Sequence, residues 1–305
     1  MDFKQITLAE KELFRPYLAM RRHDLITYNF TNFYLWRDWD PYGWAEIEGA
    51  LVIKSDYHDW DAVLPPFAPK DGPILKATEH LIEWYKERQI PFLMTEVSEA
   101  VRVFYEHYWP GRFTATEFPP GFNYIYRQED LAQLAGQQYA AKRNHVHHFM
   151  RENPGFRFLP LTAEWIAGCR DMELAWLQRH DEANEAILHE HSGVMDALDH
   201  LDELDCLGAC LVGREQVIAF TIGEPLNGDT FAIHIEKADI GVRGSFQAIN
   251  QFFARDFCIG YRFINRAEDM GHPGQRKAKL SYHPHHLEKK YHLRLSEEKT
   301  HVPLG

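Results

Sequence analysis

The sequence predicts an α+β fold made of two similar halves, each a mixed sheet flanked by helices. The first observation is a repeated order of elements: a strand, two helices, three strands, a helix, a strand, a helix and a strand can be read twice. The second is that the 305 residues, 45% hydrophobic and 26% charged, have the length and composition of a soluble two-domain protein. The repeat lies in the order of elements and not in repeated sequence.

The first half opens with an amphipathic helix, because Thr7 and Glu10 have the spacing of a capping box. Ser98 can cap a later helix in the same half, and Pro65-Pro66 interrupts the chain between elements. The periodicity of apolar residues predicts the other elements: a helix at 31–36, two strands within 45–54, a strand near 59–64, a helix at 74–88, a strand at 91–95, a helix at 98–108, and closing strands at 112–117 and 122–127.

The second half follows a polar helix, 137–152, which Asn153-Pro154-Gly155 ends. Thr162 can cap the next helix, and Asn227-Gly228 is a strong hairpin signal. The remaining pattern predicts a strand at 156–159, a helix from 162 towards 179, a helix reaching about 203, strands at 206–212, 216–223 and 230–236, a helix from 245 that ends before 260, and strands at 261–264 and 291–295.

This element order is that of the acyl-CoA N-acyltransferase (GNAT) fold, so we expect two tandem GNAT-like domains. The expected boundaries are 1–136 for the first domain, 137–154 for a linking helix and 155–305 for the second domain.

Charge and hydropathy narrow the class of protein. The net charge of −12 argues against a DNA-coating protein, although it leaves room for a local basic patch. Neither an apolar run long enough for a membrane span nor a secretory signal is visible, so a cytoplasmic protein is expected. The four cysteines, none in a C-x-x-C pair, are expected to be free thiols. Histidines are abundant but lack zinc-site spacing, so no metal site is expected.

The densest group of chemistry-bearing residues lies between 265 and 282. Carboxylates, cations, glycines and a tyrosine follow a predicted strand, which is the composition of an anion-binding loop. The alternative is a solvated charged loop with internal ion pairs. The residues concerned are Asn265, Arg266, Glu268, Asp269, Arg276, Lys277, Lys279 and Tyr282.

Two further groups are candidates for binding anions. Gly241 and Gly244 lie between the strand that contains His234, Glu236 and Lys237 and the next helix, where free N–H groups attract anions. The alternative is an ordinary tight turn, since the glycines are three apart where acyltransferases of this fold have them two apart.

Lys142 and Arg143, on the linking helix, form the local basic patch and are candidates for tRNA contact. A solvated helix between domains is the alternative interpretation.

These segments resemble the phosphatidylglycerol lysyltransferase C-terminal-like family, most specifically at 265–282. The other matching segments are 28–32 with Trp36, 142–145, 234–239 and 247–250. The resemblance implies a tandem GNAT fold related to Fem-type enzymes. It also implies transfer of an aminoacyl group from aminoacyl-tRNA to an amine or hydroxyl acceptor.

The expected reaction is direct acyl transfer without a covalent enzyme intermediate and without a tightly bound cofactor. Glu236, Glu268 and Asp269 are candidate bases, and Tyr282 is the candidate acid for the leaving group. The predicted donor ligands are Lys237, Gly241, Gly244, Arg266, Arg276, Lys277 and Lys279, with His234 and Asn265 as supporting residues. Acyl-CoA as the donor, or an RNA- or peptide-binding module without catalysis, remain alternatives. The acceptor is left open.

Overall fold

The computed structural model describes residues 1–19, 23–56, 61–178 and 185–296. The chain divides into two compact units. The first comprises residues 1–122 and 288–305, and the second comprises residues 123–287.

The first unit contains a seven-stranded sheet in the order β1-β2-β3-β4-β5-β14-β6. Its core is built from apolar residues of the sheet and of two helices packed on it, α3 and α4. The elements are β1 Lys4–Gln5, η1 Leu8–Glu10, α1 Lys11–Ala19, α2 Phe30–Leu35, β2 Gly43–Ile47, β3 Ala50–Ser55, β4 Ala62–Val63, α3 Asp71–Glu87, β5 Leu93–Ser98, α4 Glu99–Tyr108, β6 Phe113–Glu117, η3 Pro119–Gly121 and β14 Lys290–Leu295.

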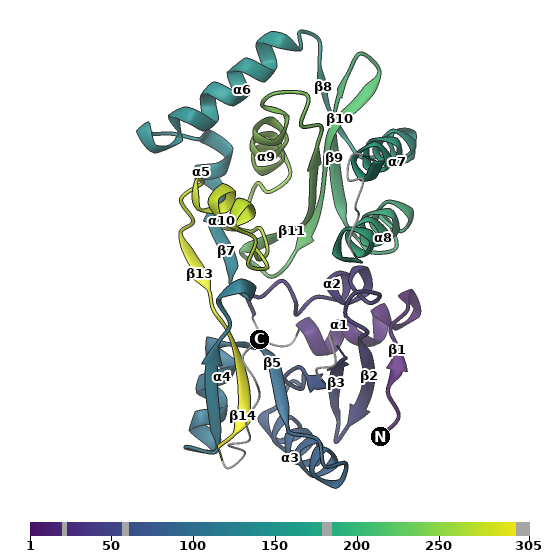
Figure 1. The fold of residues 1–305 in the computed structure, drawn as a ribbon, viewed down its shortest axis with the longest axis vertical. Helices are drawn as coiled ribbons and strands as arrows, with labels where there is room; N and C mark the ends of the chain where they lie inside the picture. The colour runs from purple at the N-terminus through teal and green to yellow at the C-terminus, as the bar shows by residue number, and fades with distance from the viewer. Residues whose placement is uncertain (20–22, 57–60, 179–184, 297–305) are drawn as a thin grey trace. The chain divides into compact units, whose positions relative to one another are not determined.

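The second unit contains a seven-stranded sheet in the order β13-β7-β12-β11-β10-β9-β8. Helix α9 lies on one face of this sheet, and α7 and α8 lie on the other (Figure 1). The elements are β7 Asn123–Arg127, α5 Gln128–Gln133, η4 Gln137–Tyr139, α6 Ala140–Glu152, β8 Arg157–Pro160, α7 Ala163–Gln178, α8 Glu185–Asp199, β9 Leu207–Gly213, β10 Gln216–Pro225, β11 Thr230–Ala238, α9 Ser245–Asp256, β12 Phe263–Asn265, α10 Pro273–Leu280 and β13 His286–Glu288.

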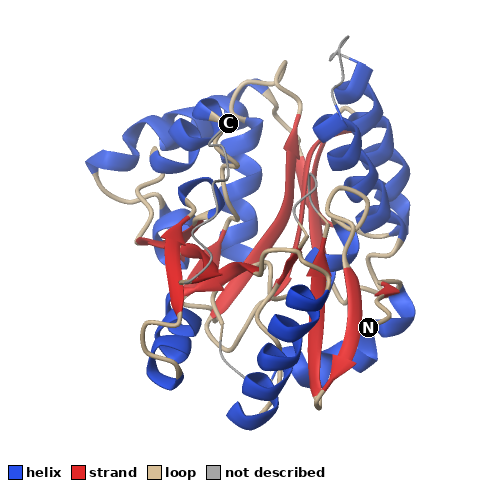
Figure 2. Ribbon diagram, turned by 60° about the horizontal axis from the view of Figure 1, so that its bottom comes forward, coloured by secondary structure: helices blue, strands red, loops and turns tan. Residues whose placement is uncertain are grey.

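The prediction of two tandem GNAT-like domains is confirmed. Each sheet has one parallel pair at the equivalent place, β4 with β5 and β11 with β12, and helices flank the strands in each unit (Figure 2). The predicted capping box is present, since Thr7 accepts a hydrogen bond from Ala9 and Glu10 accepts one from the Thr7 backbone.

The units differ from the expected domain boundaries because the two halves exchange strands. β7, from the first half, lies between β12 and β13 of the second sheet, and β14, from the end of the chain, lies between β5 and β6 of the first. The second unit therefore begins at Asn123, ahead of the expected linking helix at 137–154, where a start at residue 155 was expected. Local sequence specifies that a segment is extended and which face is apolar, but not which sheet it joins.

The structure also describes the cysteines, the length of the apolar helices and the grouping of metal-binding side chains. Cys169, Cys206, Cys210 and Cys258 are free and buried. No helix in the described part of the chain is long and apolar enough to cross a membrane. Within those same residues, no group of three or more His, Cys, Asp or Glu side chains has the arrangement of a metal site.

Candidate active site

The candidate site begins where strands β11 and β12 stop pairing. Their parallel ladder ends at Ala232 and Asn265, whereas β11 continues to Ala238. We call residues 233–238 and 265–269, which start where this ladder ends, the fork. Within it, the β10–β11 register shifts so that His234 is the extra residue of a β-bulge. A bulge interrupts the hydrogen-bond ladder and changes the direction of the side chains next to it. The side chains that follow the paired parts of β11 and β12 can therefore meet beside the bulge.

An ion pair crosses the fork. Arg266 Nη2 donates to Glu236 Oε1 at 2.8 Å, and Asn250 Nδ2, from α9, donates to Glu236 Oε2 at 2.8 Å. Burial lowers the pKa of Arg266, but the nearby Glu236 charge outweighs it, so the pKa lies above its ordinary value. Two polar atoms beside this pair, Arg266 Nη1 and Asn250 Oδ1, are buried and have no hydrogen-bond partner among the described residues.

Tyr282 lies between two cations. The Lys142 ammonium is 4.1 Å from the centre of its ring and the Arg266 guanidinium is 4.9 Å away. Burial raises the pKa of Tyr282, so the phenol stays protonated at neutral pH. Lys142 also donates to Ser281 Oγ at 2.6 Å, and burial together with Arg266 lowers the pKa of Lys142. The expectation that Tyr282 belongs to the same site as Arg266 agrees with this geometry.

Asp269 anchors the loop that follows β12. Only 1% of the residue is exposed, and its carboxylate accepts hydrogen bonds from Tyr124 Oη at 2.5 Å, Arg276 Nε at 2.9 Å and the Gly271 backbone at 2.8 Å. Burial raises the pKa of Asp269, but hydrogen bonds from Arg276, Tyr124 and Gly271 bring it below its ordinary value. The expected role of Asp269 as a base does not fit, because Tyr124, Arg276 and Gly271 already occupy its carboxylate. The Arg276 side chain is 45% exposed, so its expected role as a phosphate ligand stays a prediction.

Glu268 is held at the fork by a chain of buried amides. Asn265 Nδ2 donates to Asn123 Oδ1 at 2.9 Å, and Asn123 Nδ2 donates to Glu268 Oε2 at 2.8 Å. Asn265 also accepts from the backbone of Ala267 at 2.8 Å, where φ is +54°. Asn265 and Asn123 are fully buried, so they fix the position of the Glu268 carboxylate. The supporting role expected for Asn265 agrees with these contacts.

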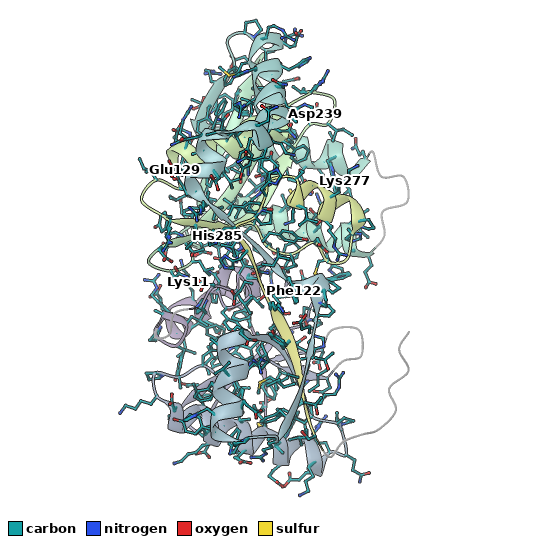
Figure 3. All side chains as sticks on the ribbon, turned by 90° about the vertical axis from the view of Figure 1, so that its left-hand side faces the viewer. Lys11, Phe122, Glu129, Asp239, Lys277 and His285 are labelled. Carbon is teal, nitrogen blue, oxygen red and sulfur yellow. The ribbon has the colours of Figure 1, made fainter. Side chains whose placement is uncertain are left out.

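Lys279 and Lys277 occupy different surroundings on α10. Lys279 Nζ donates to the backbone carbonyl of Arg266, and burial, followed by the Arg266 charge, lowers the pKa of Lys279 to about 8. Lys277 is exposed on the same helix (Figure 3). Of the two, only Lys279 contacts the fork, while Lys277 remains available to a ligand that approaches from solvent.

The side chain of Lys237 points away from Glu236 and Arg266, contrary to expectation. Consecutive residues of a strand point to opposite faces of a sheet, so Glu236 faces α9 and Lys237 faces α7 and α8. The Lys237 ammonium lies 2.8 Å from Glu190, 3.5 Å from Glu173 and 3.7 Å from the ring centre of Trp176.

The expected pyrophosphate turn is also built differently. The Gly241 N–H donates to Asp239 Oδ1 at 2.9 Å, so a carboxylate occupies the place where a phosphate was expected. Gly244 has φ +89°, and a Cβ atom there would lie 2.2 Å from the carbonyl oxygen of His145 on α6. The two glycines therefore close the turn and let α9 approach α6; neither arrangement favours an anion.

His234 and Arg143 are held by contacts within the chain. His234 Nε2 lies 2.9 Å from Glu224 Oε1. Arg143 donates to the carbonyls of Leu134 and, at 2.6 Å, Gly136, which follow α5. The expected tRNA contact of Arg143 does not fit, because its guanidinium satisfies carbonyls at the end of a helix. Lys142 points instead to the fork.

Sequence reasoning missed several residues that complete the site. Asn123, Tyr124 and Tyr126 reach it from β7, and Asn250 reaches it from α9. The helix start at 247–250 was noted, but no local signal indicated that Asn250 would bind Glu236. The residues of β7 could not be assigned to the site, because the sequence did not predict that β7 pairs with β12 in the second sheet.

Comparison with known proteins places this geometry in context. The family model for the C-terminal part of phosphatidylglycerol lysyltransferase matches residues 21–294. A conserved protein of unknown function from Bacteroides thetaiotaomicron is 33% identical, with a TM-score of 0.89 over 97% of this chain and 99% of that chain.

More distant structures share the fold alone. L-PGS from Bacillus licheniformis is 15% identical, with a TM-score of 0.66 over 97% of this chain and 94% of its own. FemX is 10% identical, with a TM-score of 0.58 over 97% and 98% of the two chains.

An uncharacterized protein of Mycoplasmoides gallisepticum is 26% identical over 186 residues, 55% of this chain and 54% of that protein. The match to this curated relative thus spans about half of its length.

Proposed function

This chain belongs to the phosphatidylglycerol lysyltransferase C-terminal family, and we propose that its fork transfers an aminoacyl group from aminoacyl-tRNA to an amine or hydroxyl acceptor. The family match supports aminoacyl transfer as the class of reaction. The groups that meet at and beside the bulged strand support the place: the carboxylates Glu236 and Glu268, the tyrosines Tyr126 and Tyr282, and the cations Lys142, Arg266 and Lys279.

The observation that carries the proposal is the pair of unpartnered atoms beside Glu236. Arg266 Nη1 is a buried donor and Asn250 Oδ1 is a buried acceptor, and neither has a hydrogen-bond partner among the described residues. An unpaired buried polar atom costs about 1–3 kcal/mol, so such atoms favour a ligand that pairs them. An aminoacyl ester has the complementary groups: its carbonyl oxygen accepts from Arg266, and its α-ammonium donates to Asn250.

Arg266 then stabilises the negative charge that develops on the carbonyl oxygen during attack. Its guanidinium is oriented in advance by Glu236, at 2.8 Å, and by the cation–π contact with Tyr282. Glu236 is thus a positioning residue, since both of its oxygens are already occupied by Arg266 and Asn250.

Proton transfers complete the reaction. The acceptor nitrogen or oxygen forms a bond to the carbonyl carbon and gives its proton to Glu268, and the bond from that carbon to the ribose oxygen breaks. The ribose oxygen takes a proton from Tyr282. Two observations support these roles: the buried Asn265–Asn123 chain fixes Glu268, and burial raises the pKa of Tyr282, so the phenol is protonated at neutral pH and carries the proton that it donates.

The surroundings favour tRNA over coenzyme A as the donor. Asp239 occupies the turn where a pyrophosphate was expected, and its carboxylate would repel one. Three cationic side chains, Lys142, Arg266 and Lys279, instead lie together at the fork, and Lys277 is exposed on α10, the helix that carries Lys279. The phosphates near the 3′ end of an aminoacyl-tRNA therefore meet positive charge as the aminoacyl ester enters the fork.

Thermal shift with two ligands tests the choice of donor. Aminoacyl-tRNA, carrying a non-hydrolysable amide in place of the ester, is expected to raise Tm, whereas coenzyme A at the same concentration is not. Lys142→Gln should weaken the tRNA effect several-fold, and Lys86→Gln, an exposed lysine of α3, should leave it unchanged. Stabilisation by coenzyme A, or tRNA binding without transfer to either amine or hydroxyl acceptors, would contradict the proposal.

A further inference from the structure

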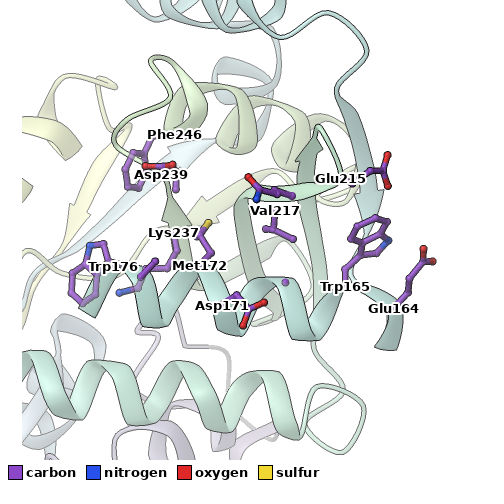
Figure 4. Close-up of a pocket in the computed structure, with 14 residues that line it drawn as sticks. Glu164, Trp165, Asp171, Met172, Trp176, Glu215, Val217, Lys237, Asp239 and Phe246 are labelled. Atoms are coloured by element: carbon purple, nitrogen blue, oxygen red, sulfur yellow. The ribbon is translucent and has the colours of Figure 1, made fainter. Parts of the chain in front are cut away.

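A second candidate site lies on the opposite face of the second sheet from the fork. A pocket of about 400 Å³ is formed between α7 and the strands β10 and β11 (Figure 4). One face of α7 lines it, with residues at helical spacing: Glu164, Trp165, Gly168, Asp171, Met172, Ala175 and Trp176. The volume is that of a small-molecule site.

Small residues shape the pocket floor. A Cβ atom at Gly168 would lie 2.8 Å from Val217 Cγ2, so glycine lets α7 approach β10 closely. Met172 and Val217 provide apolar surface along the middle, and Phe246 from α9 adds an aromatic ring at one end (Figure 4). Ala175 also lines the pocket. The floor therefore suits an aliphatic chain lying along α7.

The charge of the walls is negative. Glu164 and Asp171 line the pocket and form no ion pair with any residue that the structure describes. Asp239 lines the end near Phe246, and Glu215 lines the end near Trp165 (Figure 4). The ion pair of Glu215 with Arg157 is solvent-exposed and weak. Lys237 also lines this pocket, but Glu190 and Glu173 already neutralise it.

Tryptophans at the two ends have surfaces that suit cations. Lys237 lies 3.7 Å from the ring centre of Trp176, and Arg157 lies 5.2 Å from that of Trp165. Both distances are within the range in which an indole attracts a cation. The alkyl chain of Lys237 ends in an ammonium that lies between an indole and two carboxylates. This contact shows, within the chain itself, how the pocket can bind an alkylammonium group.

We propose that this pocket binds a linear polyamine, a flexible alkyl chain with two or more ammonium groups. Glu164 and Asp171 are seven residues apart on α7, which places them about 10 Å apart along the helix at 1.5 Å per residue. Two separated carboxylates joined by an apolar floor match ammonium groups joined by methylene chains. A lysine side chain from a peptide has the same chemistry but only one ammonium, so it pairs with one carboxylate at a time. This site is independent of the transfer reaction at the fork.

Isothermal titration with spermidine tests the proposal. Saturable binding with one site per chain is expected, and Glu164→Gln combined with Asp171→Asn should weaken it at least 10-fold. Glu129→Gln combined with Asp202→Asn removes the same charge from exposed positions outside the pocket and should change the affinity less than two-fold. Circular dichroism checks that both variants fold.

Three results would overturn the assignment. Equal weakening in both double variants would mean that spermidine responds only to net charge. Tighter binding of N-acetyl-lysine methylamide than of spermidine would assign the pocket to a peptide lysine. Binding of Mg²⁺ with the same sensitivity to Glu164 and Asp171 would assign it to a metal ion. Neither failure nor success of aminoacyl transfer affects these outcomes.

Discussion

Replacing Arg266 by Gln is expected to lower aminoacyl transfer by about 10²- to 10³-fold, the usual cost of removing one donor to a developing oxyanion. The reason is that Arg266 Nη1 is the buried donor at the fork that no described residue occupies. The measurement is the single-turnover rate of transfer from charged tRNA with enzyme in excess, which separates the chemical step from tRNA binding.

A matched variant separates this effect from loss of folding. Arg266→Gln alone leaves the Glu236 carboxylate, of which 13% is exposed, without its cation, and this is destabilising. The double variant Glu236→Gln with Arg266→Gln removes both charges and should recover most of the lost stability. Transfer should stay low in the double variant. Recovery of transfer together with stability would show that Arg266 has only a structural role.

Replacing Asp269 by Asn is expected to lower the free energy of unfolding by about 2–3 kcal/mol, because an amide replaces a buried acceptor of three groups. Its partners are Tyr124, Arg276 and the Gly271 backbone. Urea unfolding measures the loss. Asp256→Asn, which breaks an exposed pair with Arg255, is the control and should change stability by less than about 0.5 kcal/mol.

The same substitution should change the response to acid. The pKa of Asp269 is lowered in the folded protein, so its ionised form favours folding. This contribution is complete above the unfolded value of about 4 and is lost as the pH falls through the lower folded value. Asp269→Asn should therefore flatten the fall in stability below pH 4. An unchanged acid profile would show that ionisation of Asp269 contributes nothing to folding.

Much of the fold was predictable because it depends on local patterns. The Asn227-Gly228 turn, the Ser98 cap and the apolar runs of β9 to β11 are each determined by neighbouring residues. Helix α10 was expected only from the repeated element order and its bounds were not predicted, because its eight residues carry few apolar side chains and only Pro273 at its start marks a helix. The exchange of β7 and β14 was not predictable, since it depends on pairing between distant segments.

The candidate site was predictable at the level of segments but not of roles. The strand order of the fold places 234–239 beside 265–269, so Glu236 and Arg266 meet as expected. Strand alternation alone could have excluded Lys237, because it follows Glu236 directly. Nothing in the local sequence distinguished Asp269, buried among donors, from Glu268, which an amide chain holds at the fork.

The central claim is that the aminoacyl ester binds at the fork, with its carbonyl oxygen on Arg266 and its α-ammonium on Asn250. Photo-crosslinking tests it most directly, with a 3′-amino-3′-deoxyadenosine analogue of the tRNA terminus whose amide-linked aminoacyl group carries a diazirine. Mass spectrometry of the digested protein should locate crosslinks within residues 233–238 or 265–282, and Arg266→Gln should reduce them. Crosslinks confined to α7 and the start of β10, or spread over the surface without dependence on Arg266, would contradict the assignment of the transfer site to the fork.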